Sequence, residues 1–194
     1  MAREAGVPDA IVEAVRLGTE PPMTDERQKA IYQFVNLDRV EVKGAEARIE
    51  GKAGGFTGTL ALSYAEGDVI DPEGARSPLS TVDPLKLVVG AGYHDVDGRF
   101  GGQLIATHSA QKDVEATTGL CTGPCFRPGA FTILDATAFF RVTEGLTLRA
   151  GVFNIFDRKY AWWNDVRGLA DSSTIKDAYT QPGRNGSVSL SFRF

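Results

Sequence analysis

Cys121 and Cys125 are the two cysteines of the chain and the residues best suited to covalent chemistry. They enclose Thr-Gly-Pro, and this spacing across a Gly-Pro turn can close a small disulfide in an oxidising compartment. The alternative is a pair of free thiols, since a metal site needs further ligands and none lie nearby in the sequence. We therefore predict a Cys121–Cys125 disulfide.

The remaining polar residues form no catalytic pattern. The chain has two histidines, His94 and His108, and its sequence contains no Ser/His/Asp grouping, no phosphate-binding glycine loop and no cluster of metal ligands. The formal net charge of −4 gives no basic footprint for nucleic acid. We expect a protein that is not an enzyme, that binds no nucleic acid, and that holds no metal or cofactor in this segment.

The segment from Gln181 to Phe194 carries the clearest structural signal. After Pro182-Gly183, one face is apolar and the other holds serines and an arginine: Val188, Leu190, Phe192 and Phe194 against Ser187, Ser189, Ser191 and Arg193. A period of two predicts a strand. An apolar face outward, a polar face inward and a terminal aromatic residue suit a barrel wall between lipid and a polar lumen.

The same alternation predicts an all-β, antiparallel up-and-down meander of about seven strands that is part of a large transmembrane β-barrel. The expected strands are residues 31–52, 56–64, 84–94, 99–112, 131–142, 146–153 and 184–194. In the first of them the apolar phase changes at Gly44, so we predict a β-bulge there.

The predicted connections alternate in length. Short turns lie at 53–55, 95–98 and 143–145, and long loops at 66–83, 113–128 and 161–183. In a meander, alternate connections share one rim, and outer-membrane barrels have short turns on one rim and long loops on the other. An odd strand count does not match a complete bacterial barrel, so we expect a piece of a larger one.

Residues 1–30 follow a different pattern from the rest. Apolar residues between Pro8 and Leu17 predict a short helix that ends at Gly18, and we interpret 1–30 as the remnant of an outer loop. The N-terminus has no apolar core of a signal peptide and no cleavage site, and the chain has no apolar run long enough for a transmembrane helix. We expect either a cytosolic protein or the tail of a longer exported one.

Beginning near Asn154, the runs LTLRAGVFNIFDRKY, WNDVRGL and YTQPGRN and the ending SFRF resemble the C-terminal end of TonB-dependent outer-membrane receptors. The nearest relatives are those for haem and haemoglobin, in the group with transferrin and lactoferrin receptors. The resemblance covers 31–194. The signature and terminal-strand residues are Asn154, Phe156, Asp157, Tyr160, Pro182, Gly183, Arg184, Asn185, Phe192 and Phe194.

The resemblance implies a plugged barrel of about 22 strands in the outer membrane of a Gram-negative cell. The full-length parent would contact outer-membrane lipid, its own plug domain, the TonB system and a haemoprotein at its outer loops. Haem would be its transported ligand, and this segment, as a C-terminal fragment, would supply wall and loop surface. The alternatives are a siderophore receptor of the same superfamily and a small self-contained β-barrel that binds a ligand.

The resemblance transfers no haem ligand to this chain. His94 lies beside a short turn, and His108 shares a face with Leu104 and Ala106, so we expect neither to touch haem. For Trp162 and Trp163 we favour packing in a loop or in the aromatic girdle over contact with a haemoprotein. One set of charges should face the lumen and a plug: Glu46, Arg48, Glu50, Lys86, Asp135, Arg141 and Arg149.

Overall fold

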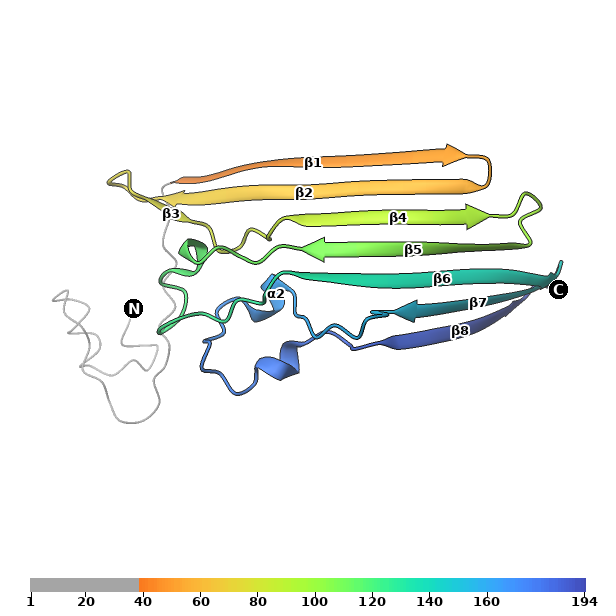
Figure 1. Cartoon of the computed structure of the whole chain (residues 1–194). Helices are drawn as coiled ribbons and strands as arrows, with labels where there is room; N and C mark the ends of the chain where they lie inside the picture. Colours follow the sequence, from red (N-terminus) through yellow and green to blue (C-terminus); the bar gives the residue numbers. More distant parts are fainter. Residues whose placement is uncertain (1–38) are drawn as a thin grey trace, which may run out of the picture. The chain divides into compact units, whose positions relative to one another are not determined.

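The computed structural model describes residues 39–194, which form one antiparallel sheet (Figure 1). Its seven long strands follow the chain order β1-β2-β4-β5-β6-β7-β8, and the short β3 pairs only with β2. The strands are β1 (Arg39–Ala53), β2 (Phe56–Ile70), β3 (Arg76–Pro78), β4 (Lys86–His94), β5 (Phe100–Ser109), β6 (Phe131–Thr143), β7 (Leu146–Phe153) and β8 (Asn185–Phe192). The predicted all-β meander is confirmed.

Several sequence-based expectations lie outside the described residues. They are the short N-terminal helix, the outer-loop remnant at 1–30, and the first part of the strand expected from Ile31. The helices that the structure describes are single turns in the connections: η2 (Glu115–Thr117), α2 (Trp163–Val166) and η3 (Lys176–Tyr179). None of the helices among residues 39–194 is long and apolar enough to cross a membrane.

Strand register places most of the apolar side chains of the sheet on one side, which we call the apolar face. Leu60 lies opposite Val89, Val89 opposite Ala106, and Ala106 opposite Leu134. Further along the sheet, Ala136 pairs with Val152, and Leu148 with Leu190. The apolar face continues without interruption from β2 to β8 because every strand keeps the same phase as its neighbours.

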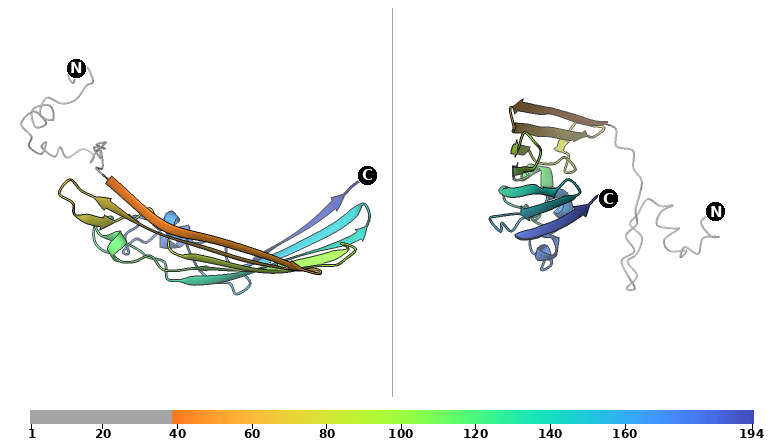
Figure 2. Two further views of the ribbon diagram at one scale, coloured as in Figure 1. Left: turned by 90° about the horizontal axis from the view of Figure 1, so that it is seen from above. Right: turned by 90° about the vertical axis from the view of Figure 1, so that its right-hand side faces the viewer.

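The opposite side, the polar face, carries the predicted lumen charges. Glu46 lies opposite Ser63, Ser63 opposite Lys86, and Lys86 opposite Ser109. Asp135, Arg141 and Arg149 follow the same phase on β6 and β7. The sheet bends and twists along its length (Figure 2), as a segment of barrel wall requires.

The connections divide by length between the two ends of the sheet, as predicted. The turns β1–β2, β4–β5 and β6–β7 lie at one end with the C-terminus, and the long connections β2–β4, β5–β6 and β7–β8 lie at the other (Figure 1). We call the first the turn end and the second the loop end. Within residues 39–194, β1 and β8 do not pair with each other, so this sheet is not a closed small barrel.

The predicted bulge at Gly44 is wrong. β1 pairs with β2 in unbroken register from Arg39↔Ile70 to Ala53↔Phe56. The apolar phase changes because the strand continues past the apolar band, since its 15 residues exceed the roughly 9–11 that cross a bilayer. Gly44 is required for a different reason: a Cβ there would lie 2.6 Å from the carbonyl oxygen of Tyr64.

The polar stretch 66–83 was predicted to be one long loop, and this is also partly wrong. β2 continues to Ile70, and Arg76–Pro78 returns beside it as β3. Charges support this extension: Arg76 contacts Glu41 at 3.0 Å and Asp68 at 3.2 Å, and Arg39 also pairs with Glu41. The observed bulge lies elsewhere, between Arg141 and Thr143.

Val88 and Val89 provide a matched test of the two faces, since Val88 lies opposite Thr107 on the polar face and Val89 opposite Ala106 on the apolar face. We expect Val89→Arg to destabilise the membrane-inserted sheet by about 2–4 kcal/mol, because a guanidinium would enter hydrocarbon. Val88→Arg should be tolerated. Both variants can be compared with the wild type by the yield of protein in membranes and by the denaturant midpoint in lipid. Equal effects of the two variants would contradict the assignment of the faces.

Candidate functional site

The signature residues Asn154 and Asp157 join the end of β7 to the start of β8. Asn154 is 3% exposed, and its side-chain amide donates to the carbonyl oxygens of Arg158 (2.9 Å) and Pro182 (3.2 Å). Its Oδ1 accepts from the backbone N–H of Arg158 at 2.8 Å. Both residues have a positive φ, 50° and 52°, a conformation that Asn and Asp tolerate better than most side chains.

Asp157 explains the Pro-Gly-Arg sequence that follows. Its Oδ1 accepts from the backbone N–H of Arg184 at 2.7 Å, and a Cβ on Gly183 would lie 2.6 Å from the same oxygen. Asn185 closes the turn by donating to the carbonyl of Gly183 at 2.9 Å. The two motifs are therefore the halves of one clamp, and the clamp sets where β8 begins.

The other signature residues lie apart from the clamp. Tyr160 stacks on Phe131 with ring centroids 4.5 Å apart, and burial raises the pKa of its phenol. Phe156 is exposed beyond β7, Phe192 lies on the apolar face opposite Leu146, and Phe194 is exposed at the C-terminus. The structure brings Asn154, Asp157, Pro182, Gly183, Arg184 and Asn185 together, and leaves Phe156, Phe192 and Phe194 separate.

The three long connections form the second candidate site, which we call the loop cap (residues 71–85, 110–130 and 154–184). Trp163 is 4% exposed and packs with Ala161 and Val166, and Leu120, Phe126 and Leu169 surround this core. The indole N–H of Trp163 donates to the carbonyl of Ser80 at 2.8 Å. Trp163 thus fastens the third connection to the first.

Backbone and side-chain bonds tie the middle connection to the other two. Phe126 N donates to Leu169 O at 2.8 Å, and Asp171 N donates to Pro124 O at 2.9 Å. Lys112 donates to Val82 O at 2.7 Å, and burial lowers the pKa of its ammonium group. Cys121 and Cys125 are joined as a disulfide with Cα atoms 5.4 Å apart, and Cys125 forms a β-bridge with Ala170.

Both tryptophans pack at the loop end, but in different places. Trp162 packs edge-on against Phe131 and Tyr160, and the Lys86 ammonium lies 4.6 Å from its ring centroid. Trp162 therefore lies over the polar face at the loop end, while Trp163 lies inside the cap. The sequence did not indicate the partners Ser80 and Asp83, because they precede Trp163 and Asn164 by about 80 residues.

Neither histidine has the surroundings of a metal or haem ligand. His108 lies on the apolar side of β5, and its Nδ1 is 2.9 Å from the hydroxyl of Thr132. His94 ends β4 on the polar face, near the ring of Phe139. Within residues 39–194, no three His, Cys, Asp or Glu side chains are arranged to hold a metal ion.

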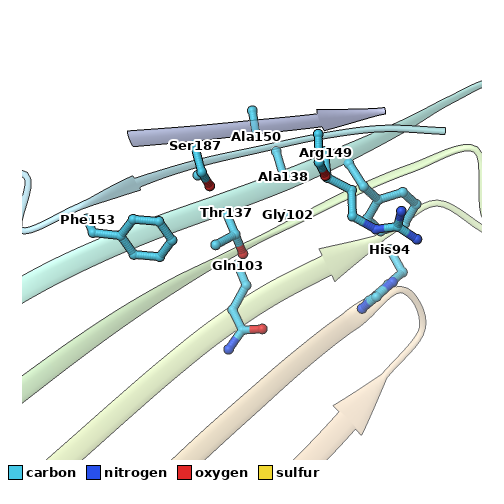
Figure 3. A pocket seen from close by; sticks show the side chains of 12 residues that line it. His94, Gly102, Gln103, Thr137, Ala138, Arg149, Ala150, Phe153 and Ser187 are labelled. Atoms are coloured by element: carbon cyan, nitrogen blue, oxygen red, sulfur yellow. The ribbon is translucent and has the colours of Figure 1, made fainter. Parts of the chain in front are cut away.

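A cavity of about 380 Å³ lies on the polar face toward the turn end (Figure 3). Side chains from β4 to β8 project into it, among them His94, Gln103, Arg149, Phe153 and Ser187. It combines a cation, two aromatic rings and several hydrogen-bonding groups. The sequence predicted which face these residues share, but it did not indicate that they surround one cavity.

Asn154→Ala should lower the free energy of unfolding by about 1–3 kcal/mol, because it leaves buried backbone groups of the clamp without partners. Asp177→Asn is the control, since it removes only the exposed pair with Lys159 at 2.6 Å; its effect should stay within about 0.5 kcal/mol. Denaturant unfolding in detergent measures both. Equal midpoints for the two variants would show that the clamp does not stabilise the sheet.

Trp163→Ala should open the loop cap locally, because it removes the centre of the buried cluster and the bond to Ser80. We expect trypsin to cleave the connections at least about tenfold faster, as expected when local opening becomes more favourable by more than 1.4 kcal/mol. Trp162→Ala, which removes rings outside that cluster, should leave the rate nearly unchanged. Similar rates for both variants would refute this role of Trp163.

Comparison with known proteins identifies the fold and its relatives. The family described as TonB dependent receptor-like, beta-barrel matches residues 8–155. The chain is 28% identical to the probable hemoglobin and hemoglobin-haptoglobin-binding protein 4 of Haemophilus influenzae, over 87% of this chain and 19% of that protein. It is 30% identical to hemoglobin-binding protein A of H. influenzae, over 84% of this chain and 18% of that protein.

Further matches share less of their sequence with this chain. Transferrin-binding protein A of Neisseria meningitidis serogroup B is 26% identical, over 84% of this chain and 18% of that protein. Among solved structures, the copper transporter OprC superposes with a TM-score of 0.62 at 21% identity, over 80% of this chain and 24% of that one. The pyoverdine outer membrane receptor FpvA of Pseudomonas aeruginosa superposes with a TM-score of 0.58 at 20% identity, over 80% of this chain and 22% of that one.

The chain spans about a fifth of the length of the curated relatives that it matches. The names of those relatives describe proteins that bind haemoglobin. The two-faced meander and the separation of turns from loops agree with a barrel wall. With the family match extending over most of its length, the chain belongs to the TonB-dependent receptor-like β-barrel family.

Proposed function

We propose that this chain is a C-terminal portion of the barrel of an outer-membrane receptor that takes up haem or haemoprotein-derived iron. The observation that carries the proposal is the identity of the curated relatives, whose names state that they bind haemoglobin. The alignments cover more than four fifths of this chain. In this proposal the loop cap forms part of the surface that a haemoprotein contacts, and haem is cargo.

The surface of the loop cap supports a role in protein binding. Tyr179 is 38% exposed and Ile175 is 54% exposed, beside the short helix η3. Aromatic and large apolar side chains are enriched in the buried centre of protein interfaces. Lys176, which lies next to Ile175, is held by contacts of its own: its ammonium group lies 5.2 Å from the centroid of the Phe126 ring and donates to the carbonyl of Asp171. A preformed surface loses less entropy on binding than a mobile one.

The proposal requires further parts that the whole receptor would supply. β1 and β8 leave unpaired edges within the described sheet, and the apolar face is exposed along its length. Unpaired edges and apolar surface are expected when further barrel strands and outer-membrane lipid complete the structure. A plug domain would lie against the polar face, and the TonB system would supply the energy for uptake.

Two alternatives have weaker support. A siderophore receptor is compatible with the likeness to the pyoverdine receptor, but 20% identity indicates only a common fold. A small self-contained barrel that binds a ligand would need β1 to pair with β8, and the described sheet keeps these two strands at opposite edges. The haemoprotein proposal therefore has the best support.

Binding of haemoglobin to cells that produce the complete receptor tests the proposal. We expect Tyr179→Ala combined with Ile175→Ala to weaken binding by about fivefold or more, because truncating an interface anchor costs more than about 1 kcal/mol. Val96→Ala is the control, since Val96 is exposed in a turn at the opposite end of the sheet. The receptor with Val96→Ala should bind haemoglobin with the same affinity as the wild type.

The cargo is tested on the same cells. The proposal predicts growth on haemoglobin as the iron source, and slower growth of cells that carry the double variant when haemoglobin is scarce. If the receptor binds a ferric siderophore and ignores haemoglobin, the siderophore alternative replaces this proposal.

A further inference from the structure

The Cys121–Cys125 disulfide lies where the middle connection of the loop cap meets the third one. Residues 124–126 run beside residues 169–171, with a β-bridge between Cys125 and Ala170. Backbone hydrogen bonds of 2.9 Å and 2.8 Å flank this bridge on either side. The disulfide is therefore attached directly to the short paired segment that joins the two connections.

The disulfide also spaces two side chains that cover the buried core of the loop cap. Leu120 and Phe126 come directly before and after the two cysteines, and both pack against the core formed by Ala161, Trp163 and Val166. Between them lies the ring of five residues that the disulfide closes, with the Cα atoms of the two cysteines 5.4 Å apart. The disulfide therefore limits how far the two covering side chains can move from each other.

The contacts continue from the disulfide to η3 and to the exposed apolar side chains beside it. The ammonium group of Lys176 lies 5.2 Å from the centroid of the Phe126 ring and donates to the carbonyl of Asp171 at 2.6 Å. The backbone N–H of Asp171 in turn donates to the carbonyl of Pro124. Both sequence neighbours of Cys125 thus help to hold the start of η3.

The two sulfur atoms differ in their access to solvent. Cys121 is half-buried, whereas Cys125 is buried. A thiolate from solvent therefore attacks the sulfur of Cys121 more readily, forming a mixed disulfide and releasing Cys125 as a thiolate. With a dithiol as reductant, its second thiol group displaces Cys121 and closes a cyclic disulfide. The dithiol is oxidised, and the two cysteines receive its two electrons and two protons.

The surroundings of the sulfur atoms also suit two thiols. Cys121 Sγ lies 3.6 Å from the carbonyl oxygen of Leu169, and Cys125 Sγ lies 3.7 Å from the carbonyl oxygen of Thr117. After reduction each S–H group can donate to the oxygen that it faces, so that neither is left without a partner. These hydrogen bonds are weak, because a thiol is a poor donor. The reduced segment can therefore separate from the core and close on it again.

We propose that the Cys121–Cys125 disulfide is a redox-sensitive latch of the loop cap. In the oxidised state it restricts the conformations that residues 120–126 can adopt away from the core, so opening of the cap is unfavourable. Reduction removes this restriction, and the third connection then opens together with the middle one. The inference rests on the proposed function only in identifying the surface beside η3 as one that binds a haemoprotein.

The experiment follows amide hydrogen exchange by mass spectrometry in the complete receptor in detergent, before and after reduction with dithiothreitol. We expect the amides of residues 169–179 to exchange at least about tenfold faster after reduction, because even a short disulfide loop makes the open state less favourable by this factor or more. The amides of β4 and β5 should exchange at unchanged rates, which shows that the sheet stays folded. Reoxidation should restore slow exchange in residues 169–179.

Two variants separate the effect of this disulfide from that of any other in the complete receptor. Cys121→Ser combined with Cys125→Ser should exchange at the faster rate without reductant, and dithiothreitol should change that rate no further. Thr122→Ala alters the same ring and keeps both cysteines, so its exchange rates should stay within about twofold of the wild type. If the serine variant fails to fold, reduction and reoxidation of the wild type decide the question.

Three results would overturn the proposal. They are faster exchange that is confined to residues 110–130, exchange in a folded serine variant that is as slow as in the oxidised wild type, and fast exchange that persists after reoxidation. Failure of the receptor to bind haemoglobin would refute the proposed function and leave these exchange rates unaffected. The two proposals therefore fail separately.

Discussion

The phase of side-chain alternation is the constraint on which this structure depends. Seven strands pair in an order that keeps Leu60, Val89, Ala106 and Leu134 in one row and Lys86 with Ser109 in another. A slip of one residue in any strand would place its polar side chains among the apolar ones. Between the two edge strands the backbone hydrogen bonds are satisfied from strand to strand, so the apolar face there can contact lipid, where unpaired polar groups are costly.

Burial of apolar side chains within the protein contributes to stability at one end of the sheet only. The buried apolar residues among 39–194 are Ala116, Cys125, Phe131, Ile133, Ala161, Trp163 and Val166, all at or near the loop end. The sheet therefore has no internal core, and the loop cap has a small one of its own. The indole nitrogen of Trp163 joins the third connection to Ser80 in the first, 83 positions earlier in the sequence, and the bond from Phe126 N to Leu169 O joins the second connection to the third.

The sequence predicted what depends on neighbouring residues and missed what depends on distant ones. Alternation located the strands, and the turn residues located the short connections. The phase change at Gly44 was interpreted as a bulge, because local pattern cannot distinguish a bulge from a strand that leaves the apolar band. Asn154, Asp157 and the segment Pro182–Arg184 were all recognised as signature residues, but the hydrogen bonds that join them became visible only in the structure. The partners of Trp163 likewise depend on contacts between loops that lie far apart in the sequence.

The direction of the strands limits how the sheet can be closed. Each strand is antiparallel to its neighbours in the order β1-β2-β4-β5-β6-β7-β8, so β1 and β8 run in the same direction (Figure 1). They cannot pair antiparallel with each other, nor with the same strands of a second copy in the same orientation. Closing an antiparallel barrel around the polar face requires an odd number of additional strands. A plugged transporter of about 22 strands meets this condition, because it adds about fifteen.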